Sequence, residues 1–383
     1  MLILPGKNFF LLIALLLANV SQAKELLGPE EGVVPYGMGR AYSAIADDWL
    51  SLYYNPAGLA LVKNIDLQLF DLSLSSNDDV RKNYSHFKEV AKSSKGSLAD
   101  SISELAGKHV MASAANVTQI TVPNFALGVV YRAHTDFDLE NLAYPTTQMR
   151  FTRDFAIIGG GAVTGGKRKE FRLGAAVKWI KRTGGMKEIP ISEILGNDRK
   201  SIADLFNQTG TGLGGDVGLQ YRLPIPGRVE YTASFVWHDI GKTSFGGVQA
   251  QNPPTRIEEN AVAGLGIRFP IGGMKNRRLE RRYGPSRSTS HLSFAFDYSH
   301  LNYSLNEEQF AKHCHLGMNL DLPILSLQLG LNQSSLSFGT SFDIGVLRIA
   351  MATYGEELGS FAGQKPDRRY LLSIGSALGF PSR

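Results

Sequence analysis

The chain has little cysteine and, after its N-terminal residues, no long apolar run. Its single cysteine, Cys314, cannot form an intramolecular disulfide, so burial and backbone pairing must stabilise the fold. Beyond residue 23, no stretch of ~18 uncharged apolar residues occurs, which argues against a helical membrane protein. The formal net charge is +5, but the basic residues are scattered except between 275 and 287. This scatter argues against nucleic-acid binding.

Motifs that carry catalysis or bind cofactors are also missing. The sequence has no G-x-S-x-G, and the glycine runs 159–161 and 212–215 lack the Lys-Ser/Thr of a phosphate loop. His313 and His315 would share one strand face as half of a metal site, but no third ligand is evident. We expect them to be interior polar side chains. The sequence therefore predicts no enzyme, no metal and no cofactor.

The first 23 residues have the features of a secretory signal peptide. Lys7 precedes an apolar stretch at 9–18, and Ser21-Gln22-Ala23 places small residues at the two positions that determine cleavage. An uncleaved helical anchor is the alternative, but the apolar stretch is shorter than the ~20 residues that span a bilayer. We therefore expect the protein to be exported.

Apolar and polar residues alternate with period two through much of the chain from residue 109 onward. Between 312 and 322, for example, one face carries Cys314, Leu316 and Met318, and the other carries histidine, glycine, asparagine and aspartate. Such two-faced strands occur in soluble sandwiches, where the apolar face is buried, and in outer-membrane barrels, where it meets lipid. Alternation alone leaves both open.

The number of strands and the lengths of their connections favour the barrel. About fourteen segments qualify as strands: 65–75, 109–122, 124–135, 149–165, 170–183, 210–223, 228–240, 258–270, 290–303, 311–322, 324–333, 335–344, 346–355 and 368–380. Long and short connections alternate between them, as in outer-membrane proteins. Two connections break the rule: the basic one at 271–289 is long, and 332–335 is short. These exceptions leave open that one strand is miscounted.

We predict an all-β fold: a closed antiparallel transmembrane β-barrel of about 14 strands in the outer membrane of a Gram-negative bacterium, surrounded by its lipids. In lipid every backbone polar group must be paired, and without apolar helices only an edge-free barrel achieves this. The last strand, 368–380, fits with aromatic residues near both ends. Helical periodicity at 83–109 and 191–207 predicts short helices in two long connections.

The stretch DDWLSLYYNPAGLA, 47–60, combines two acids with a turn. Asp47 and Asp48 are adjacent, so in an extended segment they point in opposite directions and would not form a catalytic carboxylate pair. We expect them to make hydrogen bonds. Residues 55–58, Asn-Pro-Ala-Gly, are typical of a tight turn.

The longer stretch GMGRAYSAIADDWLSLYYNPAGLAL, 37–61, resembles the N-terminal signature of the FadL/TodX outer-membrane transport superfamily, PorV-like relatives included. The signature reads G-M-G-x-A-[FY]-x-A-x-A-D-D followed by Y-x-N-P-A-G-L. Arg40 stands where a second glycine is frequent, and Trp49-Leu50 replaces small residues. The rest of the chain shares with the family its strand count, two Asp-Ile-Gly phrases and the terminal strand.

The resemblance implies three parts: a signal peptide at 1–23, an N-terminal plug or hatch inside the lumen at 24–60, and the barrel at 61–383. It implies plug or gating roles for Gly37, Gly39, Asp47, Asp48, Trp49, Asn55, Pro56, Ala57 and Gly58. Hydrophobic small molecules such as long-chain fatty acids would bind near the outer mouth, shift the hatch and leave sideways between early strands.

A second hypothesis is a PorV-like scaffold or shuttle that binds an exported protein partner and transports no small molecule. The compact size and several modest loops favour it. An outer-membrane lipase is a third hypothesis, disfavoured because no Ser-His-Asp arrangement is visible.

Overall fold

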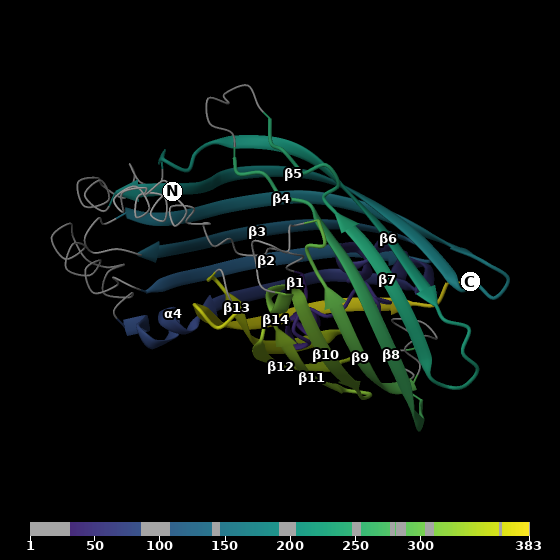
Figure 1. Cartoon of the computed structure of the whole chain (residues 1–383). Coiled ribbons are helices and arrows are strands. Elements are labelled where there is room, and N and C mark those ends of the chain that lie inside the picture. The colour runs from purple at the N-terminus through teal and green to yellow at the C-terminus, as the bar shows by residue number, and fades with distance from the viewer. Residues whose placement is uncertain are drawn as a thin grey trace, which may run out of the picture.

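Fourteen antiparallel strands form a closed barrel in which β1 pairs with β14 (Figure 1). The computed structural model describes residues 31–85, 108–139, 146–190, 204–246, 254–275, 280, 289–302, 310–359 and 362–382. The predicted closed 14-stranded barrel is confirmed. The predicted signal peptide lies outside the described residues, as do most of the two predicted loop helices.

The strands follow one another around the barrel in chain order, so each hairpin joins neighbours. Their bounds are Ile65–Asn77 (β1), His109–Val122 (β2), Phe125–Leu139 (β3), Thr146–Gly165 (β4), Phe171–Pro190 (β5), Thr209–Arg222 (β6), Glu230–His238 (β7), Asn260–Lys275 (β8), Thr289–Tyr298 (β9), Cys314–Asp321 (β10), Leu325–Asn332 (β11), Ser335–Ile344 (β12), Leu347–Glu357 (β13) and Pro366–Phe380 (β14). A short helix, Asp78–Lys82 (α4), follows β1.

Of the two connections that broke the expected alternation, the short one at 332–335 is described in full and hides no strand. Gln333 and Ser334 both have positive φ, 51° and 78°, which suits the two-residue turn of a tight hairpin between β11 and β12. In the basic connection, β8 itself runs on to Lys275. The strand predicted at 290–303 was too long, because β9 ends at Tyr298 and His300 has a left-handed φ of 57°.

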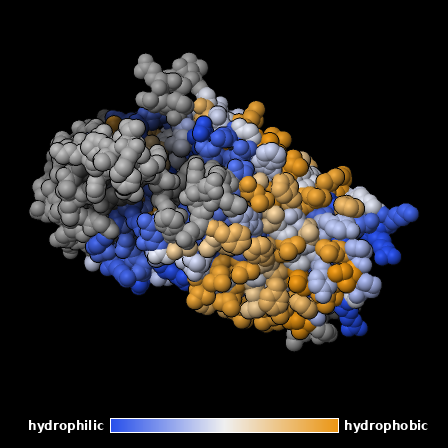
Figure 2. All heavy atoms as spheres, viewed as in Figure 1, coloured by the Kyte–Doolittle hydropathy of each residue, from blue (hydrophilic) through white to orange (hydrophobic). Residues whose placement is uncertain are grey.

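The outer surface of the barrel is apolar and the inner surface is polar. On β10, Leu316 is 46% exposed, whereas His315, Asn319 and Asp321 are buried. This arrangement is the reverse of a soluble sandwich and decides the question that alternation left open. Figure 2 shows apolar side chains gathered over β6–β12. The barrel therefore crosses the outer membrane with its apolar face in lipid. Among the described residues, no helix is long and apolar enough to cross a membrane.

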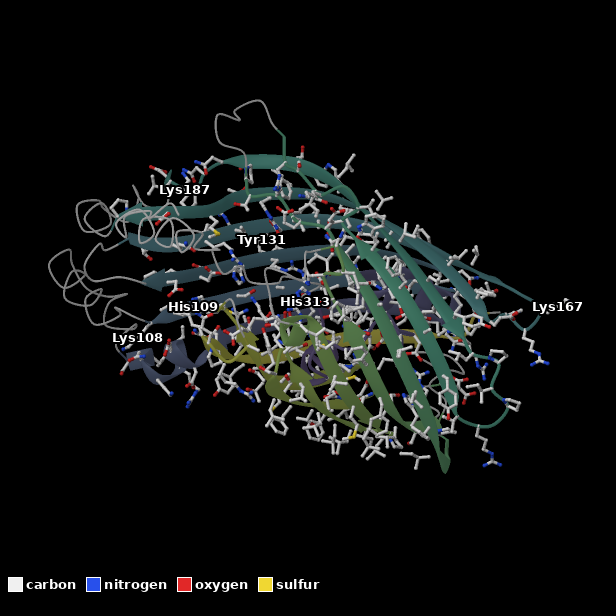
Figure 3. The ribbon with its side chains drawn as sticks, in the orientation of Figure 1. Lys108, His109, Tyr131, Lys167, Lys187 and His313 are labelled. Carbon is white, nitrogen blue, oxygen red and sulfur yellow. The ribbon has the colours of Figure 1, made fainter. Side chains whose placement is uncertain are left out.

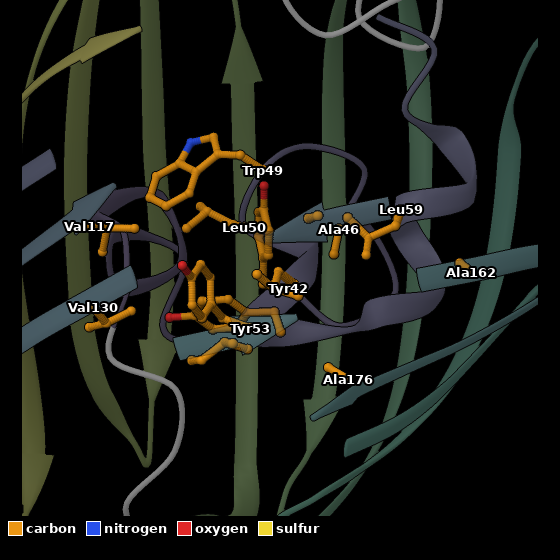
Figure 4. Packing of buried hydrophobic residues seen from close by; sticks show 14 of the residues in the cluster. Tyr42, Ala46, Trp49, Leu50, Tyr53, Leu59, Val117, Val130, Ala162 and Ala176 are labelled. Atoms are coloured by element: carbon orange, nitrogen blue, oxygen red, sulfur yellow. The ribbon is translucent and has the colours of Figure 1, made fainter. Parts of the chain in front are cut away.

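The barrel interior holds the chain's own N-terminal segment, residues 31–62, which we call the interior segment. It contains the helices Val33–Gly37 (α2) and Ser51–Tyr54 (α3) and the 3₁₀ helix Pro56–Leu61 (η1). Its apolar side chains form the main hydrophobic core together with inward-facing residues of β2–β5. Figure 4 shows Trp49, Leu50 and Tyr53 of this segment beside Val117 and Val130 of the wall.

Candidate functional site

The interior segment is almost fully shielded from solvent, with Met38, Tyr42, Leu52 and Leu59 completely buried. Its first helix, α2, lies against β11–β14, and η1 lies against β3–β6. The segment therefore contacts both sides of the barrel.

The Asn-Pro-Ala-Gly turn both starts a helix and attaches it to the wall. The Asn55 side chain accepts a hydrogen bond from the Ala57 N–H at 3.1 Å, capping η1, and Pro56 follows at the first helical position. The Asn55 amide donates to the Ser43 carbonyl at 3.0 Å and to the Leu219 carbonyl of β6 at 3.3 Å. One side chain thus fixes the turn, an earlier loop and a barrel strand.

Asp47 and Asp48 have different partners. Asp47 is buried and forms an ion pair with Arg268 of β8 at 2.7 Å. Asp48 accepts a hydrogen bond from the Leu50 N–H at 3.0 Å, within the interior segment. The two carboxylates therefore do not act as a pair: one holds the segment to the wall and the other shapes the backbone before α3.

Two wall residues that the sequence did not single out hold the middle of the segment. Asp297 of β9 accepts hydrogen bonds from the Tyr42 N–H at 2.9 Å, the Ser43 N–H at 2.8 Å and the Ser43 hydroxyl at 2.7 Å. Gln220 of β6 donates to the carbonyls of Ser43 at 3.1 Å and Ala46 at 3.0 Å. Their place on polar strand faces was readable from the sequence, but their distance from Ser43 depends on how the segment folds back.

Glycines allow the segment's backbone to touch the backbone of the wall. A Cβ on Gly37 would lie 2.8 Å from the Gly339 Cα of β12. A Cβ on Gly39, whose φ is +61°, would lie 2.4 Å from the Leu331 carbonyl oxygen. Gly58 is as crowded, because a Cβ there would lie 2.2 Å from the Ala46 carbonyl oxygen. These predicted site glycines therefore fit by close packing.

Arg40 has a left-handed backbone conformation with φ of 70°. Its guanidinium pairs with Glu356 of β13 at 2.9 Å and lies over the Tyr36 ring, 5.8 Å from the centroid. Burial lowers the pKa of Arg40, but the Glu356 carboxylate and the side chains of Tyr36, Tyr54 and Tyr354 together hold that pKa above its ordinary value. A charged pair thus occupies the interior where the family pattern often has glycine.

Trp49 and Leu50 are core residues of the segment. The Trp49 ring meets the Tyr53 ring edge-on, with centroids 6.1 Å apart. The backbone carbonyl of Trp49 accepts a hydrogen bond from the Gln119 amide of β2 at 2.8 Å. Leu50 packs under Gly32, where a Cβ would lie 2.6 Å from a Leu50 methyl. Both side chains belong to the main hydrophobic core that the segment forms with the wall.

His313 and His315 are interior polar side chains linked through Ser299. The His313 ring bonds the Ser299 carbonyl at 2.8 Å, and the His315 ring bonds the Ser299 hydroxyl at 2.9 Å. His315 also reaches the Gly39 carbonyl of the interior segment at 3.0 Å. His313 ends a 3₁₀ helix, Phe310–His313 (η3), so the two do not share a strand as predicted. Among the described residues, no cluster of three potential metal ligands occurs.

A small polar cavity of about 30 Å³ remains between the segment and the wall. Tyr36 and Arg40 of the segment line it, with Arg132, His134 and Arg369 of the wall. Its size and lining suit water or an ion better than an apolar cargo.

The expected lateral exit lies where the early strands pair. The β1–β2 ladder runs from Asp66 and Thr121 to Ser76 and Ala112, with a bulge between Gln68 and Asp71. The bulged residues Leu69 and Phe70 are both exposed, and the Thr118 hydroxyl donates to the Leu69 carbonyl at 3.0 Å. The bulge is thus a local interruption of an otherwise paired wall.

No protein-family model matches the sequence, and no curated protein matches it by sequence. By structure, the chain is similar to the CymD monoaromatic hydrocarbon channel, with 12% identity over 93% of this chain and 99% of that one and a TM-score of 0.45. The Ralstonia pickettii toluene transporter TbuX gives 12% identity, the same coverage and a TM-score of 0.43.

The chain is also similar to two further solved structures. The Pseudomonas putida toluene transporter TodX gives 11% identity, 93% and 99% coverage and a TM-score of 0.43. CdiB from Acinetobacter baumannii gives 10% identity and a TM-score of 0.34. The match covers 82% of this chain and 60% of CdiB.

Proposed function

We propose that this outer-membrane barrel takes up hydrophobic small molecules and that the interior segment is its gate. The observation that carries the proposal is how the segment is held. It lies inside the barrel without joining the sheet, and side chains such as Asp297, Gln220 and Arg268 bind it to the wall. The segment can therefore move while the barrel keeps its own backbone pairing.

A link between the segment and the β1 bulge supports a sideways exit. Gln68 of β1 pairs with Gln119 of β2 in the last regular step before the bulge. The Gln119 amide also holds the Trp49 carbonyl. Movement of Trp49 would release Gln119 beside the weakest part of the early ladder. Apolar cargo leaving there would enter lipid without crossing water.

A reversible lock tests the gate. The Ser43 and Ser234 hydroxyl oxygens are 2.8 Å apart, across the contact between the segment and β7. Ser43→Cys/Ser234→Cys in a Cys314→Ser background should form a disulfide under oxidation. We expect oxidised cells to lose uptake of labelled oleate and toluene, and a reductant to restore it.

The matched control is Ser43→Cys/Cys314→Ser, which cannot form the lock and should respond to neither oxidant nor reductant. Equal uptake by the locked and reduced double-cysteine proteins would contradict the gate.

The second candidate is a scaffold or shuttle for an exported protein. The narrow cavity beside the segment favours it, because a space of about 30 Å³ lined by charged and polar side chains does not suit an apolar cargo. Deletion of the gene should then leave oleate and toluene uptake unchanged and mislocalise surface proteins, the opposite of what a transporter predicts.

A further inference from the structure

A large apolar groove lies on the outside of the barrel, away from the interior segment. Its volume is about 940 Å³, and it extends across seven consecutive strands, from β12 through β14 and β1 to β4. One row of paired residues crosses it: Thr340, Met351, Leu372, Leu74, Ala114 and Ala133. Residues paired directly across antiparallel strands share a face, so the row lies on one side of the wall.

That side faces outward. Gly339, next to Thr340 on β12, packs against Gly37 of the interior segment, so Thr340 points the other way. Met351 and Leu74 of the same row are each half exposed. The groove is therefore in the lipid-facing surface, whereas the small polar cavity lies behind the same strands inside the barrel.

The groove exists because small side chains form its floor and large ones its edges. Ala112, Ala114 and Ala133 lie in its middle, and Phe151 of β4 and Phe338 of β12 bound its two ends. The hollow is therefore the space that the small side chains leave between the two aromatic rings.

Cationic side chains stand at one end of the groove. Tyr370 of β14 lines the groove, and the Arg81 guanidinium of α4 lies over its ring, 5.4 Å from the centroid. Lys82 is the next residue of α4, and Arg368 precedes Tyr370 by two positions on the same strand face. The Arg368 guanidinium reaches across to the Leu336 carbonyl of β12.

These cationic side chains outnumber the acidic side chains around them. Arg81 and Lys82 share one carboxylate, Asp78, at 2.7 and 2.5 Å, and the Tyr370 hydroxyl also donates to it. The neighbouring Asp79 accepts from the His109 N–H, and Lys108 bonds Asn83. Arg81 and Lys82 remain more than half exposed despite their shared acid.

This end of the barrel is the external one by the loop-length rule. The connections that follow β1, β5, β7 and β9 are long, and α4 begins the first of them. Lys108 and Lys187 lie at this end, and Lys167 lies in a short turn at the other (Figure 3). The groove therefore lies in the outer leaflet, just below the headgroup level marked by Tyr370 and the cations.

We propose that the groove binds an acyl chain of a phosphorylated outer-leaflet lipid, whose phosphate is held by Arg81, Lys82 and Arg368. Hydrocarbon is the medium that this face meets, so an acyl chain fills the hollow without exposing apolar surface to water. Guanidinium and ammonium groups above it match a phosphate in charge and hydrogen bonding. The site is independent of the gate.

Binding of purified full-length protein to diphosphoryl lipid A in neutral detergent, followed by native mass spectrometry and titration, tests the site. Ala114→Phe should fill the floor and abolish binding, with Ala133→Leu as a second filling variant. The matched control is Ala175→Phe, an outward small residue on β5 outside the groove. Heat-modifiable migration confirms that each variant is folded.

The cations are tested separately. Arg81→Ala/Lys82→Ala should weaken binding at least about tenfold at low salt, and the difference should shrink at high salt. Lys167→Ala/Arg168→Ala removes two exposed cations at the other end and should change nothing. Dephosphorylated lipid A should bind the native protein as weakly as the phosphorylated form binds the double variant.

Undiminished binding by both folded filling variants would overturn the site. Equal binding of phosphorylated and dephosphorylated lipid would overturn the role of the phosphate. If Ala114→Phe converts a dimer to a monomer and leaves lipid binding unchanged, the groove is an interface between copies of the chain and the lipid proposal is wrong.

Discussion

At the scale of single residues, Arg40 shows how a departure from a family pattern is accommodated. Its φ of 70° is a conformation in which glycine is comfortable and other residues are strained by roughly 1–2 kcal/mol. That conformation gives a physical reason for a glycine at this position. Here the ion pair with Glu356 and the contact with the Tyr36 ring offset the strain. Arg40 in place of glycine is thus stabilised by a specific partner on the wall, Glu356.

Asp297 is the residue on which we expect the interior segment to depend most. Asp297→Ala removes three hydrogen bonds to a charged acceptor. The buried N–H groups of Tyr42 and Ser43 then lose the carboxylate that accepts from them. The free energy that holds the segment against the wall should therefore fall by on the order of 3 kcal/mol. Planar-bilayer recordings should show frequent opening, and cells should become sensitive to large hydrophilic antibiotics.

The control for this prediction is Ser293→Ala on the same strand. Ser293 is fully buried, and among the described residues its hydroxyl has no hydrogen-bond partner. It should keep wild-type conductance. A closed, silent Asp297→Ala protein would show that the other contacts suffice.

At the scale of elements, the strands were predictable and the attachment of the interior segment was not. Alternation of side chains along one strand is a local property, so segments such as 109–122 were placed with the bounds that β2 has. The contact between Asp297 and Ser43 joins residues 254 apart in the sequence. It depends on barrel closure and on the path of the segment, and alternation encodes neither. The Asn-Pro-Ala-Gly turn was readable because its chemistry is local.

The η1 helix packs directly against glycines of the wall, and this contact can be tested. A Cβ on Gly174 of β5 would lie 2.3 Å from the Ala57 nitrogen and from the Pro56 carbonyl carbon. Gly174→Ala should therefore push the turn off the wall, at a cost of about 1–3 kcal/mol typical of overpacking. Limited proteolysis should then cut the interior segment faster.

Gly159→Ala on β4 is the matched control, because its Cβ would meet only a Leu127 methyl at 3.6 Å, an ordinary contact. It should leave the cleavage rate unchanged. Equal rates for the two variants would mean that η1 does not rest on this surface.

At the scale of the whole molecule, the fold is an inside-out arrangement that only a lipid environment explains. Exposed large apolar side chains occur on every strand from β1 to β14, while acids, amides and histidines are buried against the interior segment or one another. In water, this distribution would expose most of the apolar surface and bury much of the polar surface. The interior segment and the inward-facing apolar residues of β2–β5 together form the main core.

The depth of the barrel in the membrane can be tested on the outward face of β14. Ile374 of β14 is outward-facing, 41% exposed, and lies midway along the strand between Arg368 and Phe380. Arginine on the lipid face costs ~2–4 kcal/mol at the bilayer midplane and ~0–1 kcal/mol near an interface. Ile374→Arg should therefore destabilise the folded barrel by the larger amount, and Leu378→Arg, nearer the end of the same strand face, by less. Urea unfolding in lipid vesicles measures both. Equal losses for the two variants would place the membrane elsewhere on the barrel, and with it the outer-leaflet position on which the lipid groove depends.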